Sequence, residues 1–211
     1  MRKLLLQLDT SIHPSAFDQV VAYDMGVDAI MSYGGVTPDA AEELVHGCIF
    51  TRGPNDLQHT AIFIGGTDMA AGEELLASVQ RAFFGPMRVS VMLDSNGSNT
   101  TAVAAVTKIE EAAGGVDGKR AVITAGTGPV GVRAAGLLAG RGADVVMTSR
   151  RFEYAKEVAQ ATAKRFGGSI SAVRMVDATE ASETLDGANV VLNAGGAGIC
   201  LVPKEAWAQR E

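Results

Sequence analysis

The sequence predicts an α/β fold with two domains, each built on a parallel sheet. Apolar runs of strand length alternate with segments of helical periodicity along the chain, as is typical of parallel sheets covered by helices. The glycine-rich segment 114–118 (GGVDG) interrupts this alternation, which restarts directly after it. We therefore expect one domain over residues 1–114 and another over residues 115–211.

Four strands, each followed by a helix, are expected in the first domain. Ser15 and Asp18 have the spacing of a capping box at the first helix. Thr37 and Pro38 are the N-cap and first-turn residues of the second helix. The predicted strands are 3–8, 29–32, 59–64 and 88–93, and the predicted helices are about 15–25, one from 37, one up to 83, and 99–113.

The second domain repeats the pattern. Its predicted strands are 120–125, 144–148, 169–176 and 188–193, and its predicted helices are 130–140, 153–166 and about 181–185. Only residues 199–211 follow the last glycine-rich segment, where a doubly wound domain commonly has further strands. We therefore expect this domain to be C-terminally shortened.

Composition excludes several classes of protein. Apolar residues make up 47% of the chain and charged residues 20%, which argues against disorder. The net charge of −6 gives no reason to expect nucleic acid or an anionic membrane as a partner. Cys48 and Cys200 are far apart, and the three histidines lack metal-ligand spacing, so we expect no metal. A cytoplasmic protein without a signal peptide or membrane span is predicted.

The segment 123–138 (ITAGTGPVGVRAAGLL) contains a GxGxxG motif between a predicted strand and a predicted helix. Gly126 would allow a tight turn, Gly128 the approach of a pyrophosphate, and Gly131 close packing of helix on strand. The helix N-terminus favours phosphate groups. We predict a Rossmann-like dinucleotide site at Gly126, Thr127, Gly128, Pro129, Val130 and Gly131. The alternative is a structural turn without a ligand.

The end of the next strand indicates which dinucleotide is bound. NAD-selective sites usually carry an acidic residue there for the ribose 2′-hydroxyl, whereas this sequence has Ser149, Arg150 and Arg151 and no acid before Glu153. Guanidinium and hydroxyl groups favour a 2′-phosphate, so NADP is predicted as cofactor. Alternatively, the two arginines are simply solvated.

Two further segments lie at predicted strand ends. Asn193–Gly198 (NAGGAG) would let a flat ring lie close to the backbone, so we expect nicotinamide at Ala194 and Gly195; a plain connector is the alternative. The segment 94–102 (DSNGSNTTA) is dense in polar side chains, which suits a heteroatom-rich substrate. Its alternative is a turn at Asn96–Gly97 followed by an N-cap.

Several segments together resemble one family. They are YD at 23–24, IFTRG at 49–53, AIFIGGTDMAAG at 61–72, FFGP at 83–86, MLDSNGSNTTA at 92–102 and AGTGPVG at 125–131. The chain resembles, over almost its whole length, the NADP-dependent methylene-tetrahydromethanopterin dehydrogenases of methylotrophic bacteria, some of which also accept methylene-tetrahydrofolate. The resemblance implies a pterin domain over 1–114, an NADP domain after it, and both ligands in the cleft between them.

The implied reaction is hydride transfer from the methylene bridge to NADP, giving the methenyl form in one-carbon metabolism. This reaction requires the hydride donor and acceptor to be aligned, in a site whose electrostatics tolerate a cation. Acid–base groups are less important for it. We therefore expect substrate-side roles for Asp18, Asp94, Thr100 and Thr101, while the catalytic residue stays open. A homo-oligomer is also expected, because a shortened chain would expose apolar surface.

Two other functions remain open at this point. Family members continue past residue 211, so a truncated, non-catalytic NADP-binding module or sensor is the main alternative. A reductase of small carbonyl acids would instead require a lysine or aspartate general acid, for which the sequence offers no convincing candidate. The choice between methanopterin and folate carriers also stays open.

Overall fold

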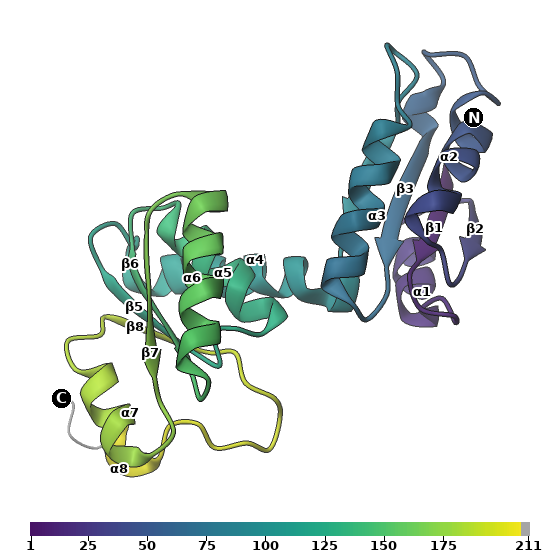
Figure 1. Ribbon diagram of the computed structural model, residues 1–211. Helices are drawn as coiled ribbons and strands as arrows, with labels where there is room; N and C mark the ends of the chain where they lie inside the picture. Colours follow the sequence, from purple (N-terminus) through teal and green to yellow (C-terminus); the bar gives the residue numbers. More distant parts are fainter. Residues whose placement is uncertain (208–211) are drawn as a thin grey trace. The chain divides into compact units, whose positions relative to one another are not determined.

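The structure, a computed structural model, describes residues 1–207. Two compact units divide the chain, Met1–Gly97 and a second that begins at Ser98. Each unit holds one four-stranded parallel sheet with helices packed on it (Figure 1). The predicted α/β fold class is thereby confirmed.

The first unit has a sheet of order β2-β1-β3-β4. Its strands are β1 (Leu4–Asp9), β2 (Ala29–Tyr33), β3 (Thr60–Gly65) and β4 (Ser90–Leu93). Its helices are α1 (Ala16–Asp24), α2 (Ala41–Ile49) and α3 (Met69–Arg81), with short 3-10 turns η1 (Pro38–Ala40), η2 (Leu57–His59) and η3 (Ser95–Gly97). All four strands predicted for the first domain are present here, with three of its four predicted helices; the fourth, predicted at 99–113, lies in the second unit.

Local chemistry explains where these helices begin. The Ser15 hydroxyl accepts a hydrogen bond from the Asp18 N–H at 3.2 Å, as the capping motif predicts. Asp68 caps α3 by accepting from Ala70 and Ala71. The second helix differs from the prediction, because Thr37 makes no side-chain capping bond and the 3-10 turn η1 precedes α2.

The core of the first unit lies between its sheet and helices α2 and α3. Alternate strand residues such as Leu8 and Ile64 are fully buried there, together with Val45, Ile49 and Leu75 of the two helices. Helix α1 has no buried residue. The apolar core of this unit therefore lies on the face that α2 and α3 cover, while the buried polar residues Gln7 and Asp9 of β1 bond to Ser15 at the start of α1.

The second unit has a sheet of order β7-β6-β5-β8. Its strands are β5 (Arg120–Thr124), β6 (Asp144–Ser149), β7 (Ser169–Arg174) and β8 (Val190–Asn193). Its helices are α4 (Ser98–Ala113), α5 (Pro129–Ala139), α6 (Phe152–Phe166), α7 (Ala178–Leu185) and the unpredicted α8 (Lys204–Trp207). One face packs on α4, α5 and α6, and the other packs on α7 and α8.

Helix α4 belongs to the second unit. Its buried residues Ala102 and Val106 share one apolar cluster with Ala134, Ala135 and Leu138 of α5. The compact units therefore divide before α4, at Gly97/Ser98, whereas the sequence places the boundary after this helix, at 114/115. The apolar stripe of α4 explains the difference, because it is buried against α5.

Along residues 1–207, none of the helices combines the length and apolarity that crossing a bilayer requires. No group of histidine, cysteine and acidic side chains within that range could hold a metal ion.

Candidate functional site

The glycine loop follows β5 and leads into α5. The Gly126 N–H donates to the Thr148 carbonyl of β6 at 3.0 Å. A Cβ at Gly126 would lie 2.9 Å from Met147 Cβ, and one at Gly131 would lie 2.6 Å from the Gly126 carbonyl oxygen. Both positions therefore require glycine, because loop, strand and helix approach closely there.

The tight turn itself differs from the expectation. Ala125, and not Gly126, takes the left-handed conformation, with φ +51°. This conformation costs a non-glycine residue about 1–2 kcal/mol. Strain of this kind gathers at functional sites.

Gly128, unlike Gly126 and Gly131, is not required to be glycine by the surrounding fold. Its backbone has φ −75° and ψ 166°, which any residue adopts. A Cβ there would meet only the Ala125 carbonyl oxygen, at an ordinary 3.5 Å. The fold alone thus does not require glycine at 128. A phosphate group approaching the N-terminus of α5 would require it, and the eleven-residue helix offers its positive end there.

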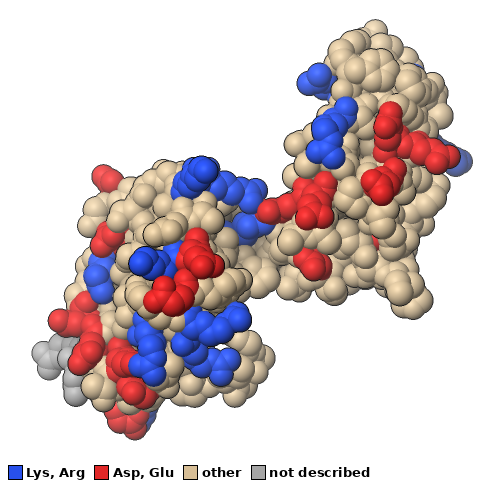
Figure 2. All heavy atoms as spheres, in the orientation of Figure 1, with Lys and Arg blue, Asp and Glu red and all other residues tan. Residues whose placement is uncertain are grey.

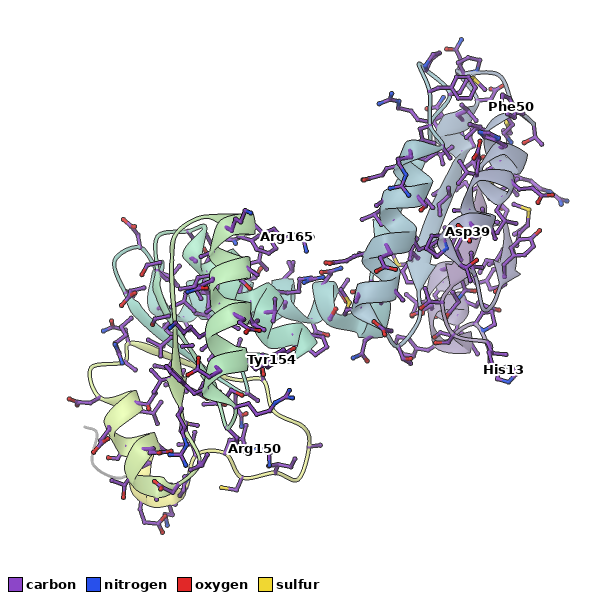
Figure 3. All side chains as sticks on the ribbon, viewed as in Figure 1. His13, Asp39, Phe50, Arg150, Tyr154 and Arg165 are labelled. Atoms are coloured by element: carbon purple, nitrogen blue, oxygen red, sulfur yellow. The ribbon has the colours of Figure 1, made fainter. Side chains whose placement is uncertain are left out.

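Ser149, Arg150 and Arg151 lie where β6 ends and α6 begins. The Ser149 hydroxyl accepts from the Arg151 N–H at 3.2 Å. The Arg151 guanidinium lies 4.4 Å from the ring centroid of Tyr154, which is a cation–π contact. Arg150 is exposed, and Figure 3 shows it at the same end of α6 as Tyr154. The two arginines therefore have different surroundings.

The sequence analysis did not identify Arg174, a third arginine at the carboxyl ends of the strands of the second sheet. Arg174 ends β7 directly opposite Ser149. It forms an ion pair with Glu180, whose other carboxylate oxygen accepts from the Val176 N–H at 2.7 Å. Only the strand order reveals its position. Figure 2 shows lysine and arginine side chains grouped on the second unit, with acidic side chains among them.

The end of β8 lies beside the end of β5. Asn193 Oδ1 accepts from the Thr124 hydroxyl at 3.0 Å and from the Gly195 N–H at 3.1 Å. The Ala194 N–H donates to the Thr124 carbonyl at 3.1 Å. A Cβ at Gly195 would collide with the Leu201 side chain. The atom it would meet is the end of a flexible side chain that could move aside, so this contact does not by itself require glycine at 195.

The polar segment 94–102 divides between two roles. Asn96 and Gly97 have φ of 57° and 58°, so the predicted turn is present. Ser95 is buried and donates to the Gly65 carbonyl at 3.0 Å. Thr100 and Thr101 are exposed in the first turn of α4. A structural turn, the alternative to a binding segment, thus accounts for Ser95–Gly97. Thr100 and Thr101 remain candidates for substrate binding.

Three carboxyl groups interact at the carboxyl edge of the first sheet. Asp9, buried at the end of β1, accepts from the Ser11 N–H at 2.8 Å and the Ser15 N–H at 3.1 Å. Burial raises the pKa of Asp18; a hydrogen bond with Ser15 lowers it, and the charges of Asp9 and Asp94 raise it further. The sequence reasoning missed Asp9, although an acid ending an apolar strand could have indicated it.

The predicted residues are distributed unevenly over the two units. Asp18 and Asp94 belong to the first unit, whereas Thr100 and Thr101 belong to the second. All of the predicted dinucleotide-binding residues lie in the second unit. Its parallel sheet and the glycine loop after β5 define a Rossmann-like α/β fold.

Solved structures share the architecture. A 5-ketofructose reductase of Gluconobacter has a TM-score of 0.57 at 15% identity, over 94% of this chain and 71% of that one. Ornithine carbamoyltransferase of Pyrococcus furiosus has a TM-score of 0.55 at 18% identity, over 93% of this chain and 60% of that one. A reductase and a transferase share this fold, so these likenesses show the fold alone.

Sequence relatives identify the family. The family described as methylene-tetrahydromethanopterin dehydrogenase, N-terminal, matches residues 16–96. The "bifunctional protein MdtA" of Methylorubrum extorquens is 52% identical over 98% of this chain and 72% of its own length. An "NAD(P)-dependent methylenetetrahydromethanopterin dehydrogenase" of the same organism is 32% identical over 97% of this chain and 71% of its own length. The chain belongs to the methylene-tetrahydromethanopterin dehydrogenase family, which confirms the predicted resemblance and the oxidoreductase class.

Proposed function

We propose that this dehydrogenase transfers a hydride from the methylene bridge of methylene-tetrahydromethanopterin to NADP, leaving the methenyl form, in one-carbon metabolism. We propose methylene-tetrahydrofolate as a second substrate of the same reaction. The observation that carries it is the 52% identity to the M. extorquens protein over nearly the whole chain. The relatives, one of them named a dehydrogenase, do not favour the alternative of a non-catalytic NADP-binding module.

The second unit has residues that fit a dinucleotide. Gly126, Gly128 and Gly131, with Thr127, Pro129 and Val130, would hold the diphosphate at the N-terminus of α5. The unexplained glycine at 128 supports this assignment. When bound, NADP supplies the hydride acceptor. The protein's own task is to orient it.

The basic end of β6 supports NADP over NAD. Ser149, Arg150 and Arg151 would surround a 2′-phosphate, and charge-assisted hydrogen bonds to phosphate are about twice as strong as neutral ones. Because Arg151 stacks on Tyr154, we assign the main phosphate contact to Arg150. One relative is named NAD(P)-dependent, so the ratio of NADP to NAD affinity is the quantity to measure.

Carboxylate groups suit the charge that the reaction creates. Loss of hydride from a carbon between two nitrogens leaves an amidinium cation, and a nearby carboxylate stabilises that charge. Asp18 and Asp94 are the proposed carboxylates, supported by Asp9 in the same acidic group. Thr100 and Thr101 are proposed to donate hydrogen bonds to the substrate.

The proposal includes a cytoplasmic homo-oligomer. Cys48 and Cys200 are unpaired thiols, which fits a reducing compartment. Helix α1 exposes large apolar side chains, with Phe17 76% and Tyr23 51% exposed. An apolar surface of this kind supports a contact with another copy of the chain.

Steady-state kinetics tests the function directly. The purified chain is mixed with methylene-tetrahydromethanopterin and NADP, and the formation of NADPH is followed by absorbance. Parallel titrations measure NADPH binding without the pterin. Turnover supports the dehydrogenase, whereas NADPH binding without turnover on either pterin would contradict it and favour the non-catalytic module.

A further inference from the structure

The side chain at the end of β8 has a defined orientation. Asn193 faces two donors, the Thr124 hydroxyl and the Gly195 N–H. Because a backbone N–H only donates, the Asn193 atom that faces it is the carbonyl oxygen Oδ1. The NH2 group of the exposed Asn193 side chain is therefore directed away from both partners. It is a donor whose direction is set before any ligand binds.

Thr124 is the residue that holds this orientation. It is fully buried at the end of β5, directly after the buried apolar residues Ala121, Val122 and Ile123. A buried hydroxyl is costly without a hydrogen bond, and its bond is made to Asn193. The Ala194 N–H bond to the Thr124 carbonyl fixes the backbone at the same point. Thr124 thus acts through Asn193 and not on a ligand.

The strand order says which part of a dinucleotide would reach Asn193. In the order β7-β6-β5-β8, the 2′-phosphate residues end β6 and the glycine loop follows β5. Neighbouring strands lie about 4.8 Å apart. A dinucleotide with its adenosine side at β6 and its diphosphate at β5 therefore continues toward β8 with its nicotinamide half.

We infer that Asn193 positions the nicotinamide half of the cofactor by donating from its NH2 group to an oxygen atom of the nicotinamide riboside. Thr124 is a positioning residue that sets the direction of this donor. The inference rests on the proposed function, and to the nicotinamide position predicted at Ala194 and Gly195 it adds an oriented donor, Asn193, and the residue that orients it, Thr124. Hydride transfer depends on ring orientation, so both residues affect turnover.

Asn193→Asp is the variant that tests it. Aspartate keeps an oxygen that accepts from Thr124 and Gly195, so the strand end is preserved, but it replaces the NH2 donor with an acceptor. Two probes are titrated by calorimetry: NADP, and adenosine 2′,5′-bisphosphate, which lacks the nicotinamide half. We expect NADP to bind about tenfold more weakly or worse, while binding of the bisphosphate is unchanged.

Two substitutions at Thr124 form a matched pair of variants, one without and one with the hydroxyl. Thr124→Val removes the hydroxyl at constant shape, and Thr124→Ser keeps it. We expect Thr124→Val to weaken NADP binding and lower kcat, and Thr124→Ser to behave as the unsubstituted chain. Equal weakening of both probes in Asn193→Asp, or unchanged NADP binding, would overturn the inference. If the unsubstituted chain bound neither probe, the proposed function itself would fail, which is a different result.

Discussion

Arg133 donates from its guanidinium Nε to the side-chain oxygen of Asn99 at 2.8 Å. Arg133 lies on α5, the helix that follows the glycine loop, and Asn99 lies in the first turn of α4. The bond therefore joins the helix that would hold the diphosphate to the helix that carries Thr100 and Thr101. Displacement of one helix would be transmitted to the other.

Asn99→Leu is expected to destabilise the second unit by about 1–3 kcal/mol, because it leaves a half-buried guanidinium without one acceptor. Urea unfolding followed by circular dichroism measures the change. Thr107→Leu, at an exposed position on the same helix, is the control. Equal stability of the two variants would show that the bond contributes nothing measurable.

The glycines of the loop are expected to separate stability from binding. Gly131→Ala places a Cβ 2.6 Å from the Gly126 carbonyl oxygen, and overpacking of this kind costs about 1–3 kcal/mol. Gly128→Ala meets no such obstacle, so we expect its stability to be unchanged and its affinity for NADPH to fall. Thermal unfolding and calorimetric titration of both variants check this. Unchanged NADPH affinity in Gly128→Ala would contradict a diphosphate at this position.

Arg150 and Arg151 are expected to affect cofactor choice unequally. Arg150→Gln should lower the preference for NADPH over NADH by about tenfold, because a charge-assisted bond to the 2′-phosphate contributes about 1.5–3 kcal/mol. Arg151→Gln should change that preference less, since its guanidinium is engaged with Tyr154. Titrations of each variant with NADPH and with NADH measure this preference. The assignment fails if Arg151 proves to control the ratio.

Asp18 makes stability depend on pH. Its folded-state pKa is raised, first by burial, so the native state binds the proton more tightly than the unfolded state. Stability therefore falls as pH rises through the folded pKa. Asn at 18 carries no such charge, so Asp18→Asn should gain stability at pH 7 and little near pH 3, below the ordinary value of 3.8.

Urea unfolding at both pH values measures this difference. Asp24→Asn, at an exposed position on the same helix, controls for the loss of one negative charge. A gain for Asp18→Asn that is equal at both pH values would rule out the ionised carboxyl as its cause.

Local sequence was sufficient to predict most of the elements and the glycine loop. Strand and helix periods repeat over a few residues, and the spacing of Gly126, Gly128 and Gly131 is itself a local pattern. The helix caps at Ser15 and the turn at Asn96–Gly97 are local in the same way. For these features, the side chains that create the structure are neighbours in the chain.

Only the tertiary structure decided which strand ends are neighbours. It brings Arg174 opposite Ser149 and Asn193 beside Thr124, across 25 and 69 positions of the sequence. It also buries α4 against α5, which moves the boundary between the units. Strand order and helix docking depend on how apolar faces far apart in the sequence are buried together, and no local period records that choice.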